Sequence, residues 1–282
     1  MRKKRILIFY HQNRKLYVPS FTINILKQEW EALGFEVKPV YGTQLGVSGD
    51  IAINHINLTV IPDSYLNYFN EFPIVLNRKL RDISKVSFSE QLLQPNDNYI
   101  GKVIIKTNAN YGGRQELILA GRKDRVINEI VRRVNWTRVS SMKSDDYIVL
   151  DDISCVPKDV WRNKHLIVEK FLPEQDKNGN YYLRAWSFLG DKNLHVITTS
   201  EHPIIKGCRI LKREFLSDSI PEELSSLRNQ MGIDYGRFDY AVVDDRIVLY
   251  DINRTPSTSQ KAAIIYSNKL KEMATGIYDC LS

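Results

Sequence analysis

Cysteine and long apolar runs are scarce in this sequence of 282 residues. The three cysteines, Cys155, Cys208 and Cys280, are odd in number and far apart, so they fit neither a disulfide framework nor a zinc site and suit a reducing compartment. No apolar run approaches the ~20 residues that span a bilayer. The apolar segment at 6–10 is too short for a secretion signal. We therefore expect a cytoplasmic protein without a membrane partner.

Charge of one sign is not in large excess either. The 40 Lys and Arg residues face 33 Asp and Glu residues and leave a formal net charge of +7. Basic clusters at 2–5, 77–85, 122–133 and 206–213 would have to converge on one face, with aromatic residues between them, to make a nucleic-acid interface. We expect no nucleic-acid partner, whereas a site for an anionic small molecule needs only a few converging cations.

The first 80 residues alternate between strand and helix patterns. The predicted elements are strands at 5–10, 35–40, 51–55 and 73–77 and a helix at 20–33. This order predicts a small parallel sheet of Rossmann-like kind. His55 ends one of these strands, where the carboxyl ends of parallel strands line ligand crevices. A structural role for His55 is the alternative.

After residue 80 the pattern changes, and strands dominate from residue 166 onward. The predicted elements are helices at 84–93 and 123–134, strands at 102–106, 166–171, 181–188, 194–199, 238–243 and 246–251, and a helical end at 260–281. There is no repeat or low-complexity stretch, so any domain boundary is compact.

The most informative segment, residues 235–256, is predicted to be a hairpin. A three-residue turn at 244–246 would pair Asp239 directly with Asp251, whereas a two-residue turn would put them on opposite faces. A site that uses both carboxylates requires the three-residue turn. An exposed hairpin whose polar residues face water is the alternative.

Two more polar residues share the faces of these carboxylates. Because residues two apart in a strand share a face, Arg237 points the same way as Asp239, and Asn253 the same way as Asp251. Two carboxylates and an amide oxygen form an all-oxygen set that suits magnesium held beside phosphates.

Two other segments place polar groups after predicted strands. Lys106 ends a strand and precedes a loop with Gly112 and Gly113. The ammonium of the lysine and the free backbone N–H groups of the loop can together surround phosphate oxygens. A plain turn between strands is the alternative. In the segment at 165–174, which contains the predicted strand at 166–171, Glu169 could accept a hydrogen bond from an adenine amino group. Glu174 or Asp176 could bind ribose hydroxyls, and an ordinary amphipathic strand is the alternative.

Together these segments resemble the ATP-grasp superfamily over about residues 104–258. The likeness rests on the strand lysine with its glycine loop, the Val-Glu-Lys-Phe sequence ending at Phe171, the Arg-x-Asp of 237–239 and the closing acidic-x-Asn with a nearby proline. It implies an α/β (α+β) protein. A Rossmann-like domain of residues 1–80 would precede an ATP-grasp module of two α+β subdomains, 81–165 and 166–282.

The resemblance also implies the roles of individual residues. Lys85 and Lys106 would bind the α- and β-phosphates of ATP, and Arg237 would steady the transferred γ-phosphoryl group. Arg184 resembles a basic residue on the following strand. The implied sets are Arg237 and Arg184 for catalysis, Lys85, Lys106, Gly112, Gly113, Glu169, Phe171 and Glu174 for the nucleotide, and Asp239, Asp251 and Asn253 for two Mg²⁺ ions.

The sequence departs from the family pattern at two positions. Asp251 stands where ligases of this family usually have Glu, and Asp-x-Asn here resembles the inositol-phosphate kinases of the superfamily. Pro256-Ser257 stands where the ligases commonly have Pro-Gly. These departures leave nucleotide and metal binding as the expectation but leave the acceptor open.

The implied activity is that of an ATP- and Mg²⁺-dependent ligase. It would join a carboxylate to an amine through an acylphosphate and release ADP and phosphate. The expected partners are an anionic small molecule or peptide and an amine acceptor. One alternative is a kinase that phosphorylates a hydroxyl, and another is a non-catalytic nucleotide-binding protein. The oligomeric state is open, and a homodimer is one alternative.

Overall fold

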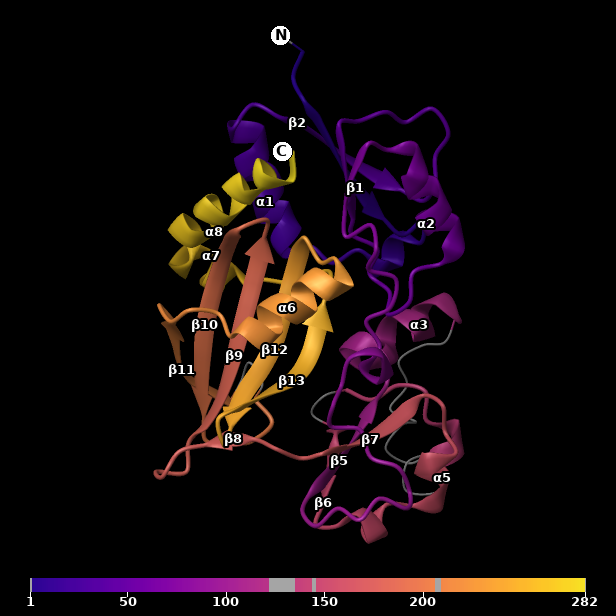
Figure 1. Ribbon diagram of the computed structural model, residues 1–282. Coiled ribbons are helices and arrows are strands. Elements are labelled where there is room, and N and C mark those ends of the chain that lie inside the picture. The colour runs from indigo at the N-terminus through magenta and orange to yellow at the C-terminus, as the bar shows by residue number, and fades with distance from the viewer. Residues whose placement is uncertain (1, 122–134, 144–145, 206–208, 282) are drawn as a thin grey trace.

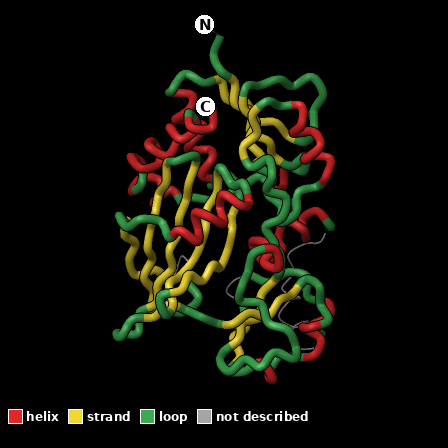
Figure 2. The backbone as a smooth tube through the Cα atoms, in the orientation of Figure 1, coloured by secondary structure: helices red, strands yellow, loops and turns green. Residues whose placement is uncertain are grey.

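The computed structural model describes residues 2–121, 135–143, 146–205 and 209–281 (Figures 1 and 2). The strands in these ranges form three sheets with helices packed against them, which confirms the predicted α/β (α+β) class. In this part of the chain no helix has the length and apolar character to cross a membrane. The predicted helix at 123–134 and residues 206–208 of the last basic cluster lie outside the described residues.

The N-terminal sheet is parallel, with the strand order β2-β1-β3-β4. Its elements are β1 (Arg5–Tyr10), α1 (Thr22–Ala32), β2 (Glu36–Tyr41), β3 (Ile51–Asn54), α2 (Asp63–Tyr68) and β4 (Ile74–Leu76). Alternate residues of β1 pack in opposite directions, so Ile6 and Ile8 meet α1 while Leu7 and Phe9 meet α2. The four strands and α1 confirm the prediction, and α2 was not predicted.

A three-stranded antiparallel sheet follows, with the order β6-β5-β7. The elements around it are β5 (Val103–Thr107), α3 (Arg114–Leu119), β6 (Ile148–Leu150), α5 (Lys158–Trp161) and β7 (Leu166–Lys170). Val103, Ile105 and Val168 point into a buried core. Because neighbouring residues of a strand face opposite sides, Lys106 and Glu169 emerge on the other face of this sheet.

The predicted helix at 84–93 is wrong. Only a single 3₁₀ turn, Lys85–Ser87, forms there. The backbone then runs beside β7, where the N–H of Leu93 donates to the carbonyl of Val168 at 2.9 Å. Pairing with a neighbouring strand satisfies backbone groups that a helix would otherwise satisfy internally. The apolar spacing of this segment therefore serves an extended chain.

The largest sheet is antiparallel, with the order β11-β10-β9-β12-β13 and β8 beside β9. Its elements are β8 (Glu174–Gln175), β9 (Tyr181–Leu189), β10 (Lys192–Ser200), β11 (Ile210–Phe215), α6 (Glu222–Met231), β12 (Tyr235–Val243), β13 (Arg246–Asn253), α7 (Gln260–Ile265) and α8 (Ser267–Ala274). Helix α6 covers one face around Trp186 and Phe238, and α8 covers the other around Leu194 and Val196 (Figure 1). Strand β11 and helix α6 were not predicted.

The C-terminal helices return to the N-terminal sheet. Trp30 of α1 donates from its indole N–H to the carbonyl of Ala274 at 2.9 Å, which ties α1 to the end of α8. The N- and C-terminal ends of the chain lie on the same side of the molecule (Figure 1). The helical end predicted at 260–281 is confirmed as α7, α8 and two short 3₁₀ turns.

Candidate functional site

The register of the β12–β13 hairpin brings two carboxylates together. Asp239 pairs directly with Asp251, and Arg237 with Asn253. The predicted three-residue turn is wrong, because Val243 pairs with Arg246 across a two-residue turn. Both residues of that turn have positive φ angles of 49° and 59°, as turns that match strand twist require.

A β-bulge at Tyr250 corrects the register. Tyr240 pairs with Leu249, and the next pair is Asp239 with Asp251, so Tyr250 is the extra residue on β13. Without the bulge the two-residue turn would place the carboxylates on opposite faces. The structure therefore reaches the expected pairing of Asp239 and Asp251 by another route than the expected turn.

These residues line a cavity of about 770 Å³ between the three-stranded sheet and the largest sheet. Of the residues predicted for a site, those in its lining are Lys85, Lys106, Gly112, Glu169, Phe171, Arg237, Asp239, Asp251 and Asn253. Strands β5 and β7 supply one wall, and β12 and β13 supply the other. Residues far apart in the sequence thus converge on one space large enough for a nucleotide.

Each of the two hairpin carboxylates faces a cation. Arg237 donates from Nη2 to Asp239 Oδ2 at 2.8 Å, and its Nε lies 2.8 Å from Oδ1. Lys85 Nζ lies 3.6 Å from Asp251 Oδ1. Burial lowers the pKa of Arg237, but the charge of Asp239, its hydrogen bond and the charge of Asp251 outweigh burial and raise the pKa overall. The guanidinium of Arg237 is therefore firmly cationic.

The donor set of the hairpin fits a hard divalent cation. Oδ1 of Asp251 is buried and has no hydrogen-bond partner among the described residues, so a lone pair is free for a ligand. Asn253 Oδ1 accepts one hydrogen bond, from the N–H of Thr255 at 3.0 Å, and keeps a second lone pair. Two carboxylates and an amide oxygen are the ligands that Mg²⁺ prefers. The described residues contain no cluster of three or more His, Cys, Asp or Glu side chains placed to hold a metal ion.

On the wall opposite the hairpin, Lys106 of β5 forms an ion pair with Glu169 of β7. The sequence predicts that Glu169 accepts a hydrogen bond from an adenine amino group, and this contact stays a prediction beside the ion pair with Lys106. Phe171 follows β7 and lines the cavity, with its N–H donating to the carbonyl of Lys102 at 2.8 Å. The apolar side of the cavity is therefore built at the end of β7.

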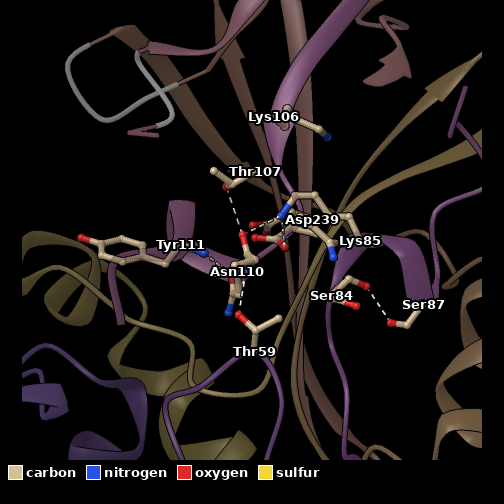
Figure 3. A network of polar contacts seen from close by, with 12 residues as sticks. Thr59, Ser84, Lys85, Ser87, Lys106, Thr107, Asn110, Tyr111 and Asp239 are labelled. Carbon is tan, nitrogen blue, oxygen red and sulfur yellow. Dashed lines mark hydrogen bonds and ion pairs between the residues drawn. The ribbon is translucent and has the colours of Figure 1, made fainter. Parts of the chain in front are cut away.

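The glycine-rich loop is a tight 3₁₀ turn, Asn110–Gly113, that leads directly into α3. Gly112 has a φ of 67°, and a Cβ there would lie 2.0 Å from the carbonyl oxygen of Met142. Gly113, which is not among the described lining residues, would place a Cβ 2.9 Å from Ser140 O. Only glycine allows this close approach. Figure 3 shows Asn110 of this loop beside Lys85 and Asp239, with the ring of Tyr111 pointing away from them.

Glu174 and Arg184 are not among the described residues that line the cavity. They form an ion pair with each other. Ala185 pairs with Asp239 and Arg184 with Tyr240, so Arg184 lies on the opposite face of the sheet from the hairpin carboxylates. The structure does not bring these two predicted residues to the cavity.

Two tyrosines in the cavity lining were not predicted from the sequence. Tyr147 lies beside Lys106, Asp251 and Glu169, and burial raises the pKa of its hydroxyl. Tyr250 donates to the carbonyl of Leu172 at 2.6 Å. Neither belongs to a recognisable motif, because Tyr147 precedes a short strand and Tyr250 enters the lining through the bulge.

His55 does not face this cavity. Its side chain is fully buried and stacks with Tyr235, with ring centroids 6.0 Å apart, while Tyr10 and Phe21 pack edge-on. Neither ring nitrogen has a hydrogen-bond partner in the described part of the chain. Burial lowers the pKa of His55 to about 3. The neutral ring is therefore part of the core.

No protein-family model and no curated protein matches the sequence. Solved structures match over nearly the whole chain at low identity. A RiPP-associated ATP-grasp ligase of Chryseobacterium gregarium, in complex with ADP and a leader and core peptide, is 10% identical with a TM-score of 0.54, covering 98% of this chain and 97% of that one. The D-cycloserine synthetase DcsG is 11% identical with a TM-score of 0.51, covering 98% and 100%.

A third match is the macrocyclase MdnC bound with precursor peptide MdnA from Microcystis aeruginosa MRC. It is 12% identical with a TM-score of 0.50, covering 99% of this chain and 100% of that one. At such identities the likeness establishes the fold and not the activity. The chain has the ATP-grasp fold.

Proposed function

We propose that this protein is an ATP- and Mg²⁺-dependent ligase that joins a carboxylate to an amine. The observation that carries the proposal is the position of Asp239 opposite Asp251 in a cavity that also holds Lys85, Lys106 and Arg237. Cations and metal-ligating oxygens within one cavity suit a nucleoside triphosphate. The ATP-grasp fold supports the same choice of cofactor.

The nucleotide would lie between the two walls. Lys85 and Lys106 would bind the α- and β-phosphates, and the loop at Gly112 would bring backbone close to them. The base would rest near Phe171, at the apolar end of β7. Asp239, Asp251 and Asn253 would hold Mg²⁺, which when bound neutralises phosphate charge and orients the triphosphate.

The chemistry needs charge neutralisation more than proton transfer. A substrate carboxylate attacks the γ-phosphorus and displaces ADP, which gives an acylphosphate. The amine then attacks the acyl carbon and displaces inorganic phosphate. Arg237, held by Asp239, is placed to neutralise charge on the transferred group. No nucleophilic side chain is required.

The acid substrate is an anionic small molecule or a peptide. Two of the similar structures are complexes with peptides, which supports the peptide class. None of the contacts among the described residues indicates where the amine acceptor would bind.

A small-molecule kinase is the second candidate. The observation that favours it is Asp251 itself, an aspartate paired with Asp239 at the position where the ligases usually have the longer glutamate. In a kinase a hydroxyl replaces the carboxylate, and the phosphoryl group stays on the product.

Product analysis tests both candidates. The protein is incubated with ATP, Mg²⁺, a panel of carboxylic acids, peptides and polyols, and hydroxylamine as a general amine. A ligase gives a hydroxamate with equal amounts of ADP and free phosphate, and Asp251→Asn abolishes all three. A phosphorylated product without free phosphate would establish the kinase. Tight Mg²⁺-dependent ADP binding without turnover of any substrate would favour a nucleotide-binding protein.

A further inference from the structure

Arg254 directly follows Asn253 at the end of β13 and is completely buried. Burial lowers the pKa of its guanidinium to about 9, with the charge of Asp82 opposing this shift. The side chain therefore stays cationic at neutral pH. A charge in the protein interior is costly unless other groups compensate it.

Carbonyl groups provide the compensation for Arg254 among the described residues. Its Nη1 donates to Leu58 O at 2.9 Å and to Ile56 O at 3.4 Å. Its Nη2 donates to Leu80 O at 2.9 Å and to Arg81 O at 3.2 Å. These carbonyls come from two segments, one after β3 and one after β4. A planar fork of donors can span both, which the single ammonium of lysine cannot do.

The segment after β3 also holds the glycine-rich loop. Thr59 accepts at Oγ1 from the N–H of Asn110 at 2.9 Å, a contact drawn in Figure 3. Its own N–H donates to Glu116 Oε1 of α3 at 3.1 Å. The start of the loop and the helix that follows it are thereby fixed to residue 59.

Asn57 joins α3 directly to the chain that follows β13. Its Oδ1 accepts from Gln115 Nε2 of α3 at 3.3 Å and from Thr255 Oγ1 at 3.1 Å. All three side chains are buried. Residues 56–59 therefore contact both the glycine-rich loop with its helix α3 and the end of β13, the strand that carries Asp251 and Asn253. We call these four residues the anchoring segment.

We propose that Arg254 is a positioning residue, which fixes Asn253 and Asp251 relative to the glycine-rich loop by holding the end of β13 on the anchoring segment. The inference rests on the proposed function, because the spacing would matter for a metal ion that Asp251 and Asn253 would hold beside the phosphates. Loss of Arg254 should therefore weaken metal binding to the nucleotide complex more than nucleotide binding itself.

Calorimetry of ADP binding to the full chain tests this role. ADP is titrated first in EDTA and then over a range of Mn²⁺ concentrations, with wild type, Arg254→Met and Arg254→Lys. We expect ADP affinity in EDTA to stay within about twofold of wild type. The Mn²⁺ concentration for half-maximal enhancement should rise at least tenfold in Arg254→Met and less in Arg254→Lys.

A matched control is Arg228→Met. Arg228 is a partly buried arginine that also donates to carbonyls, Gly190 O at 2.7 Å and Ile233 O at 2.9 Å, and it is not among the described residues that line the cavity. It should lose stability without a change in the Mn²⁺ requirement. Thr255→Val removes only the bond to Asn57, so it gives a milder test in the same direction if Arg254→Met does not fold.

Equal losses of ADP affinity with and without Mn²⁺, or a Mn²⁺ requirement unchanged in both Arg254→Lys and Thr255→Val, would overturn the positioning role. Failure of the proposed function looks different. In that case wild type itself would show no Mn²⁺-enhanced ADP binding.

Discussion

Lys106 and Glu169 form an ion pair between the neighbouring strands β5 and β7, with side chains only 8% and 5% exposed. The two residues are diagonal neighbours on one face, since Lys106 pairs with Ile167 and Glu169 lies two residues further along. Their mutual attraction offsets the loss of solvation for both charges. Neither charge is stable in this position without the other or a ligand.

The first prediction follows from this pair. Lys106→Met and Glu169→Gln should each destabilise the nucleotide-free protein by about 3 kcal/mol, because each leaves a buried charge unpaired. The double variant should be more stable than the sum of the single losses implies. Urea unfolding of all four proteins gives the coupling free energy. Additive losses would show that the two charges do not stabilise each other.

The second prediction concerns Lys85 and Asp251, whose Nζ and Oδ1 lie 3.6 Å apart. In the nucleotide-free protein the ammonium competes with a metal ion for the carboxylate. Lys85→Met should therefore strengthen Mn²⁺ binding without nucleotide by roughly tenfold, about 1.4 kcal/mol, and weaken ATP binding. Electron paramagnetic resonance of free Mn²⁺ measures the first effect. Weaker Mn²⁺ binding in Lys85→Met would show that the lysine does not oppose the metal.

The third prediction compares two glycines with similar backbones. Gly112 and Gly121 have φ angles of 67° and 65°, but a Cβ at 112 would lie 2.0 Å from a carbonyl oxygen, whereas one at 121 meets nothing within 4 Å. Gly121→Ala should cost about 1 kcal/mol for the left-handed backbone alone. Gly112→Ala should cost at least 2 kcal/mol more and should abolish ADP binding, because the loop must shift. Equal stability losses of the two variants in thermal unfolding would mean that the loop shifts away from Met142 at no energetic cost.

Most strands of this fold were predictable because they are strongly apolar or strongly alternating, whereas the short strands β6 and β8 and the largely exposed strand β11 were not. Strand β5, with Val103 to Ile105 buried, and the alternation of Asp251 and Asn253 are visible in the sequence alone. The register of the hairpin was not, because the bulge at Tyr250 carries no sequence signal of its own. The expected pairing with Asp239 was right and the expected turn was wrong.

Long-range contacts account for the other failures. The extended chain around Leu93 pairs with β7, and no local pattern reveals a partner about 75 residues away. Arg184 belongs to a strand whose two faces both carry polar residues, so the sequence does not show which face meets the cavity. The environment of Arg254 depends on carbonyls from two other segments and has no sequence signature.

The fourth prediction is the pH dependence of stability caused by His55. Burial lowers its pKa to about 3, and the nearby charge of Arg254 adds to the effect. The histidine pKa in the unfolded chain is near 6.5. Between pH 6.5 and 3 the unfolded chain therefore binds a proton at His55 that the folded chain does not bind. Stability is therefore full above about pH 6.5 and falls as the pH drops toward 3, with a slope approaching 1.4 kcal/mol per pH unit from this group.

Urea unfolding between pH 7.5 and 4.5 measures this slope. His195, whose pKa burial and Arg184 lower to about 4, contributes in the same direction. His55→Phe should reduce the slope by about one proton and leave the part due to His195. Tyr235→Phe is the control, because it alters the ring stacked on His55 without removing the titrating group. It should keep the wild-type slope. An unchanged slope in His55→Phe would mean that the pKa of His55 is not lowered by folding. That result would contradict the burial of its imidazole among Tyr10, Phe21 and Tyr235.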